Sequence, residues 1–281
     1  MKNTQLVITL GLATISLAPL DNAFAGDQTN LNTLPTIENS TSNADDWAFR
    51  VEPFVWLPGI DGTVGALGLS TDVDLSLSDL FSSSGSGRAK YDIEMLFAME
   101  VEARKGRWGV MANAVYLDLD ISGSSPSPRH LTADIDFSEF LGDLAVTYRV
   151  WEEPKGFLDL YAGARVNSLS LDINARADLI RFQREPSISV SDSETWVDPI
   201  IGLRGQWALS EKFFLAGKAD IGGFGVSSEL LWSAQATAGY QFTKNFSSEI
   251  GYSYYDTDYA DSGFIYDLAM GGLFLGLNFE F

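Results

Sequence analysis

The last fourteen residues of the chain, Leu268 to Phe281, read L-A-M-G-G-L-F-L-G-L-N-F-E-F and decide the fold. From Leu273 onward every second residue is a large apolar one, and glycine, asparagine and glutamate fill most of the positions between them. Side chains that alternate in this way point to opposite faces of a β-strand. The pattern therefore predicts a carboxyl-terminal strand with one apolar face and one polar or small face.

The beginning of the chain has the features of an export signal. Lys2 is followed by a mostly apolar run from Leu6 to Leu20 and by Ala23-Phe24-Ala25, a small-x-small cleavage site, so we expect a cleaved signal peptide over residues 1–25. Pro19 and several Ser and Thr residues interrupt the run, which is too short for a comfortable membrane helix. No later run approaches about 18 apolar residues, so a membrane-embedded mature chain would have to be a β-barrel.

The composition excludes several classes of function. The chain has 281 residues, with 18 Lys and Arg against 38 Asp and Glu, and its formal net charge is −20. Nucleic acid is an unsuitable partner for such a chain, because phosphate binding requires clustered Lys and Arg. The absence of cysteine excludes disulfides, thiolate metal sites and a cysteine nucleophile.

The chain changes character at Trp47. Residues 26–46 are polar and rich in Asn and Thr, which predicts a flexible periplasmic lead-in. From Trp47 on, apolar and polar residues alternate, and we expect one β-barrel domain over residues 47–281. Short polar turns recur within it, at 105–107, 152–156, 210–212 and 243–245. Each interval between turns has room for two strands and a connection, which is typical of outer-membrane barrels.

These intervals predict a single antiparallel transmembrane β-barrel of the all-β class, with short periplasmic turns and longer extracellular loops. We expect ten strands, an even number, near residues 47–57, 91–104, 107–121, 130–150, 157–176, 190–209, 213–226, 230–243, 246–259 and 265–281. Twelve strands is the alternative, if residues 62–79 add a pair. The segment 58–92 is otherwise a long outer loop that folds into the mouth, or an additional hairpin. The alternate positions that hold polar residues up to Asn167 hold Leu169, Leu171 and Ile173 after it, which we interpret as a β-bulge near Asn167.

Aromatic residues lie beside the proposed short turns, where an inner aromatic girdle belongs. They are Trp108, Trp151, Trp207, Phe213, Phe242, Phe246 and Phe281.

Several stretches resemble a family of uncharacterised bacterial outer-membrane β-barrel proteins, porin-like and Gram-negative. They are E-P-F-V-W-L-P-G-I-D-G-T (52–63), E-A-R-K-G-R-W-G (102–109), Y-L-D-L-D (116–120), Y-A-G-A-R (161–165), W-V-D-P-I-I-G-L-R (196–204), D-I-G-G-F-G-V (220–226) and G-Y-S-Y-Y-D-T-D-Y (251–259). The strand ending at Phe281 resembles the closing strand that the barrel-assembly machinery reads. The resemblance implies a barrel of about this size. We expect a monomer in the outer membrane, with lipid, lipopolysaccharide and that machinery as partners. It carries over no catalytic residue.

Charged residues on the inward parity are the candidate site. They are Arg50, Glu52, Glu94, Glu100, Glu102, Arg104, Asp143, Arg149, Asp159, Arg165, Asp198, Arg204, Lys218, Asp220, Glu249 and Glu280. Two interpretations stay open. Surplus carboxylates would make a narrow porin-like channel for small solutes or cations. Alternatively, opposite charges pair and close the barrel, which then serves a structural or surface-interaction role without transport.

An enzyme is the third possibility. His130, the only histidine, follows Ser122, Ser124, Ser125 and Ser127 in a connection between strands. A proteolytic or lipid-modifying enzyme could use it as a base, but no catalytic spacing joins it to Asp134 or Asp136. We therefore expect no enzyme, no catalytic residue and no cofactor.

One acidic loop is a candidate cation site. Asp256, Asp258 and Asp261 alternate before a glycine, but the complete calcium-loop spacing and its terminal Glu are missing. We therefore expect a solvated loop and no dedicated metal site. A weaker hypothesis is that these carboxylates meet lipopolysaccharide through bridging divalent cations.

Overall fold

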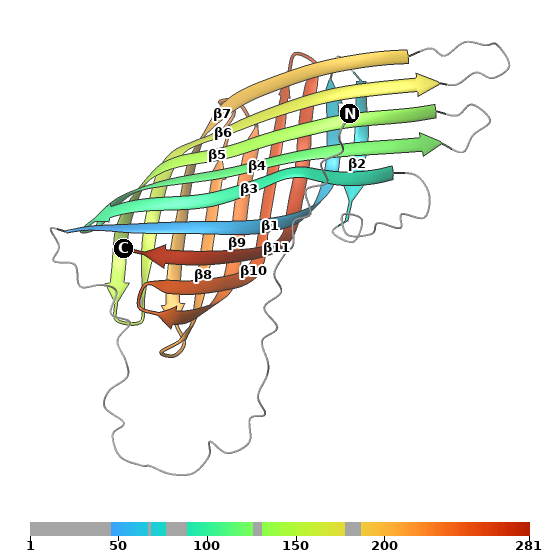
Figure 1. Ribbon diagram of the computed structural model, residues 1–281. Helices are drawn as coiled ribbons and strands as arrows, with labels where there is room; N and C mark the ends of the chain where they lie inside the picture. The colour runs from blue at the N-terminus through green and yellow to red at the C-terminus, as the bar shows by residue number, and fades with distance from the viewer. Residues whose placement is uncertain (1–45, 67–68, 77–88, 126–130, 178–186) are drawn as a thin grey trace, which may run out of the picture. The chain divides into compact units, whose positions relative to one another are not determined.

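The computed structural model describes residues 46–66, 69–76, 89–125, 131–177 and 187–281 (Figure 1). The expected signal peptide, nearly all of the lead-in, and His130 lie outside these residues. The strands are β1 (Trp47–Ala66), β2 (Leu69–Leu75), β3 (Ala89–Lys105), β4 (Trp108–Ser125), β5 (Leu131–Glu153), β6 (Gly156–Ala177), β7 (Ser187–Ala208), β8 (Phe213–Gly222), β9 (Leu230–Thr243), β10 (Phe246–Asp261) and β11 (Phe264–Glu280). No helix in the described part of the chain is long and apolar enough to cross a membrane.

Ten of the described strands form a closed antiparallel barrel. Each strand from β3 to β11 pairs with the next along the chain, β1 pairs with β3, and the pairing of β1 with β11 closes the ring. The prediction of ten strands is confirmed, and that of twelve is wrong. β2 adds one strand outside the ring, where it pairs with the outer half of β1 from Ile60 to Ala66. The described parts of 58–92 thus lie mostly in β1, β2 and β3, because alternation continues past the expected end of the first strand.

The connections are short at one end of the barrel, which we call the turn end. There β3 joins β4 through Gly106, whose φ of 57° favours glycine. At the opposite, outer end, β10 and β11 also meet in a tight turn, with positive φ at both Ser262 and Gly263, as a type I′ hairpin requires. β10 and β11 therefore extend into the region of Asp256, Asp258 and Asp261, where we expected an acidic loop.

A belt of apolar side chains faces outward around the turn-end half of the barrel. Its exposed members include Phe49, Val55, Phe97, Val110, Leu144, Val146, Leu160, Ile201, Leu203, Leu215, Ile250, Leu273, Leu275 and Leu277. The expected aromatic girdle borders it: Trp151 stacks on Trp207 at 5.6 Å between ring centroids, and Phe242 on Phe246 at 5.1 Å. This belt is the surface that lipid covers in an outer-membrane barrel.

The two faces of the wall exchange polarity partway along each long strand. On β6 the inward side changes from Arg165 to Leu169, while the outward side changes from Leu160 to Asp172. β7 changes likewise, with buried Asp198 followed toward the outer end by buried Trp196. Apolar side chains face out where lipid surrounds the wall and face in where water does. The level of exchange therefore marks where the strands leave the membrane.

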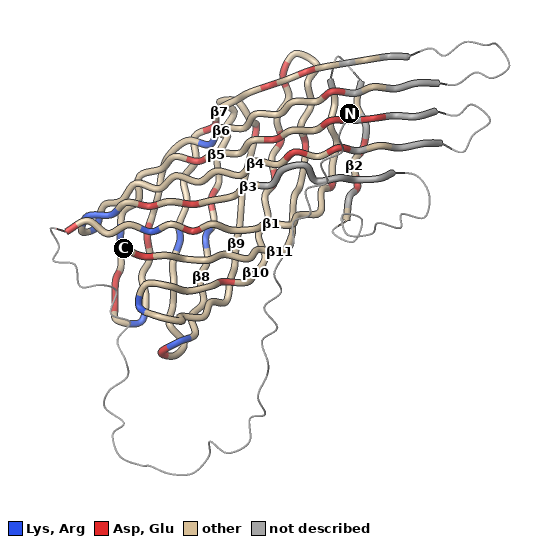
Figure 2. Tube along the Cα trace, in the orientation of Figure 1, with Lys and Arg blue, Asp and Glu red and all other residues tan. Residues whose placement is uncertain are grey.

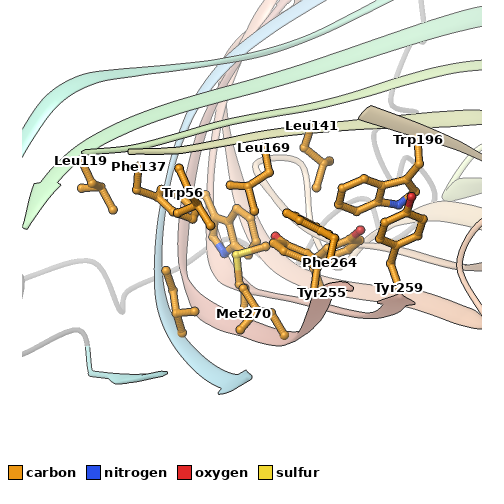
Figure 3. Packing of buried hydrophobic residues seen from close by; sticks show 14 residues of the cluster. Trp56, Leu119, Phe137, Leu141, Leu169, Trp196, Tyr255, Tyr259, Phe264 and Met270 are labelled. Atoms are coloured by element: carbon orange, nitrogen blue, oxygen red, sulfur yellow. The ribbon is translucent and has the colours of Figure 1, made fainter. Parts of the chain in front are cut away.

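Above that level an apolar cluster lies inside the barrel. Figure 3 shows side chains of opposite walls pointing toward one another, among them Trp56, Leu169, Trp196 and Met270. Trp196 stacks on Tyr259 with 4.1 Å between ring centroids. The expected bulge at Asn167 is wrong: β6 keeps its register with both neighbours there, and the apolar residues that follow simply face the lumen.

Candidate functional site

The turn-end half of the lumen contains a network of five basic side chains and four carboxylates. Its members are Arg50, Arg104, Arg149, Arg204 and Lys218 with Glu52, Glu100, Glu102 and Asp159. They come from six strands, β1, β3, β5, β6, β7 and β8, because inward parity recurs at the same level on each. Figure 2 shows Lys and Arg gathered in this part of the barrel.

Asp159 is the centre of this network. Its side chain is fully buried, and Arg104, Arg149 and Arg204 all donate to it, with N–O distances of 2.9 Å for Arg149 and 3.2 Å for Arg204. Glu100 is shared in the same way by Arg50, Arg204 and Lys218, with Lys218 at 3.0 Å. Carboxylates that bind several bases hold strands of opposite sides of the barrel together.

A second charged cluster lies closer to the apolar layer. The guanidinium of Arg165 donates to Asp143 at 2.7 and 3.0 Å and to Asp220 at 3.1 and 3.2 Å. Tyr161 and Ser233 donate their hydroxyls to Asp220 at 2.8 and 2.6 Å. All three charged groups are buried, so their hydrogen bonds replace the water they lost on folding.

The remaining inward acids are bound by neutral groups or lie at the rim. Glu249 accepts hydrogen bonds from Thr237 and, at 2.7 Å, from Asn278. Asp198 accepts the amides of Ser227 at 3.2 Å and Ser228 at 2.8 Å and so fixes the β8–β9 connection. Glu280 is exposed at the turn end. The side chain of Glu94 lies outside the described residues.

One buried acid in the apolar layer, Glu139, was not predicted from the sequence. Glu139 is 6% exposed, and Tyr266 donates its hydroxyl to it across the lumen. Its inward parity on β5, shared with Asp143, was the available signal. Its partner is 127 residues away and could not be inferred from spacing.

A cavity of about 530 Å³ opens among the charged side chains. Arg50, Glu102 and Arg149 line it, and Glu280 lines it at the turn end. Phe54 and Phe274, whose ring centroids are 5.0 Å apart, are its lining residues nearest the outer end. The apolar cluster begins directly above them with Trp56 and Met270, so the cavity leads into that cluster.

The three aspartates of the candidate cation site all lie in the outer part of β10. Asp256 and Asp258 belong to the outward face, Asp258 lies opposite Asp267 of β11, and Asp261 ends the strand. Burial and the nearby carboxylates of Asp258 and Asp256 raise the pKa of Asp267. Among the described residues, no group of three or more acids or histidines is arranged to hold a metal ion.

No family model and no curated protein sequence matches the chain. Among solved structures, it resembles the outer-membrane protease OmpT from Escherichia coli, with a TM-score of 0.53, 13% identity, and coverage of 84% of this chain and 97% of that one. The fold is that of an outer-membrane β-barrel. Two further similarities are weaker and do not bear on the fold: Ail of Yersinia pestis (TM-score 0.32, 14% identity, 84% and 99% coverage) and the toluene transporter TodX of P. putida (0.34, 10%, 87% and 92%).

This comparison corrects one expectation. The sequence led us to expect that the barrel is not an enzyme, and that conclusion is wrong as drawn, because the protease from E. coli has the same fold. At 13% identity the likeness shows the fold alone, so it reopens catalysis without assigning a reaction or a residue.

Proposed function

We propose that this outer-membrane barrel is closed, and that it acts through its outer end and not by passing solutes through its lumen. The observation that carries the proposal is the apolar cluster across the outer half of the lumen, where Trp56, Leu169 and Met270 meet from different walls. A hydrated ion would have to leave its water to cross such a layer.

The charged layer beneath supports the same proposal. Leaving out Glu94, the inward set expected from the sequence has nine acids and six bases, so three acids are in excess, and Glu139, which accepts the Tyr266 hydroxyl, adds a fourth in the apolar layer. Glu249 and Asp198 are bound by neutral donors and Glu280 is exposed. The excess is thus distributed over separate places, whereas a cation pathway requires a continuous row of available carboxylates. The proposed partners of the barrel are lipid, lipopolysaccharide and the barrel-assembly machinery.

Single-channel recording in planar bilayers tests the proposal. The refolded chain is expected to insert and give no steady current. A variant with Trp56→Ala and Met270→Ala thins the apolar layer and is expected to stay silent, because the ion-paired layer remains. Adding Arg204→Ala and Glu100→Ala, which opens that layer as well, is expected to give current. Steady cation-selective current through the unmodified barrel would overturn the proposal.

A further inference from the structure

A hollow of about 600 Å³ lies on the outward face of the barrel, within the apolar belt. Five strands, β1, β8, β9, β10 and β11, line it. Their register forms two neighbouring rows of outward side chains, one of Phe213, Tyr240, Ser248 and Leu277 and the other of Ala238, Ile250, Leu275 and Val55. The small side chains of Ala238 and Ser248 leave the space, and larger neighbours surround it: Val55, Phe213, Tyr240, Ile250, Leu275 and Leu277. Its apolar lining side chains face away from the lumen, so a ligand bound there would serve a role beyond the proposed function.

Aromatic rings continue from this hollow toward the turn end. Tyr240 contacts Phe242 with 4.9 Å between centroids, Phe242 contacts Phe246 at 5.1 Å, and Phe246 contacts Phe279 at 5.1 Å. Such rings lie at the level where acyl chains meet their headgroups. A chain that fills the hollow would therefore place its polar end just beyond this row.

Two lysines stand at that place. Lys212 ends the β7–β8 turn, and its ammonium lies 5.8 Å from the centroid of the Tyr240 ring. Lys244 lies in the neighbouring β9–β10 turn. Among the side chains that the structure describes, every exposed Lys or Arg is at the turn end, as Figure 2 shows for the chain trace. One carboxylate, Glu211, adjoins Lys212.

We propose that the hollow and the two lysines form a binding site for one phospholipid with an anionic headgroup, from the leaflet at the turn end. One acyl chain fills the hollow over Ala238 and Ser248, the ester region lies beside the aromatic row, and Lys212 and Lys244 bind the phosphate. Ammonium groups bind phosphate as point charges, which suits a headgroup held at the edge of the bilayer. A lipid is favoured over a second barrel because the apolar hollow, the aromatic row and the two lysines follow one another in the same order as the acyl chain, ester region and phosphate of a phospholipid.

Native mass spectrometry of the refolded barrel, released from micelles with equal amounts of phosphatidylglycerol and phosphatidylcholine, tests the site. The unmodified barrel is expected to retain one phosphatidylglycerol. Ala238→Phe fills the hollow and is expected to lower lipid retention several-fold, while the matched Ala162→Phe, on the outward face of β6, is expected to have no effect. Heat-modifiable gel mobility confirms that both variants fold.

The headgroup is tested separately. Lys212→Gln with Lys244→Gln is expected to abolish the preference for phosphatidylglycerol, Glu211→Gln to strengthen it, and Lys155→Gln, in another short turn, to leave it unchanged. Equal retention by the two alanine variants would overturn the site, as would equal binding of the two lipids by the unmodified barrel. The proposal would also be overturned by a lipid-free dimer that Ala238→Phe converts to a monomer. That result would show that a second copy of the chain fills the hollow.

Discussion

Replacing Arg165 by methionine tests whether the charged lumen is structural. Arg165 is 3% exposed and binds Asp143 and Asp220 through two hydrogen bonds each. Methionine has a similar length and no charge, so Arg165→Met leaves both carboxylates buried without their base. Breaking a buried ion pair in this way costs about 3–5 kcal/mol of unfolding free energy.

The geometry indicates where that cost falls. Asp220 keeps the hydroxyls of Tyr161 and Ser233 as donors, whereas we find no second donor for Asp143 in the described part of the chain. Most of the loss therefore comes from Asp143. A triple variant, Arg165→Met with Asp143→Leu and Asp220→Asn, removes all three charges and keeps an acceptor for Tyr161. It is expected to recover most of the loss, because replacing a whole buried ion cluster is often close to neutral.

The assay is urea unfolding of the barrel in lipid vesicles, followed by tryptophan fluorescence, with the free energy taken at constant slope. Arg107→Met, at an exposed position of the β3–β4 turn, is the matched control and is expected to change stability by no more than about 0.5 kcal/mol. A loss below about 1 kcal/mol for Arg165→Met, or a triple variant no more stable than the single one, would refute the structural interpretation of this cluster.

Two further predictions concern the wall itself. A methyl group on Gly202 would collide with the Tyr161 ring and lie 2.5 Å from the Ala219 carbonyl oxygen, so Gly202→Ala is expected to cost about 1–3 kcal/mol in urea unfolding. Gly217→Ala, with its nearest neighbour at 3.4 Å, is the control, and equal losses would contradict the packing argument. Asp136 lies outside the membrane belt, and its pKa is raised above the unfolded value first by burial and then by Asp120, which lies directly opposite. The folded protein therefore holds this proton more tightly than the unfolded chain does, and stability falls as the pH rises from about 4 toward neutral. Asp136→Asn is expected to flatten that fall and raise the urea midpoint at neutral pH; an unchanged pH profile would count against it.

The strands were predictable because alternation is a local property of the sequence. The strand expected at 246–259 is Phe246–Asp261, and the one expected at 157–176 is Gly156–Ala177. Period-two alternation reports the two faces of a strand directly, and turn residues report its ends. Closure followed because an even set of such strands leaves no unpaired edge in the membrane.

The filling of the lumen was less predictable, because alternation does not show which face meets lipid. Leu169 and Leu171 follow the parity of Arg165, and we interpreted them as shifted by a bulge because we assumed a polar lumen throughout. The outward parity of β6 becomes polar at the same level, as at Asp172, but one strand alone does not show whether its two faces have exchanged polarity or its phase has slipped. The partner of a buried acid is equally hidden, since Glu139 and Tyr266 are brought together by closure of the barrel.

The exchange of polarity also explains why a strongly acidic chain need not conduct cations. Within the apolar belt, the buried carboxylates of the lumen bind arginine, lysine or neutral donors. Beyond the belt, acids such as Asp136 and Asp258 turn outward and the inside becomes apolar. Repulsion between these outward carboxylates is then screened by water, and the inside of the barrel holds the apolar cluster as a hydrophobic core. In the proposed closed barrel, an ion would have to separate paired charges and then cross that core, so the two layers would block its passage by independent means.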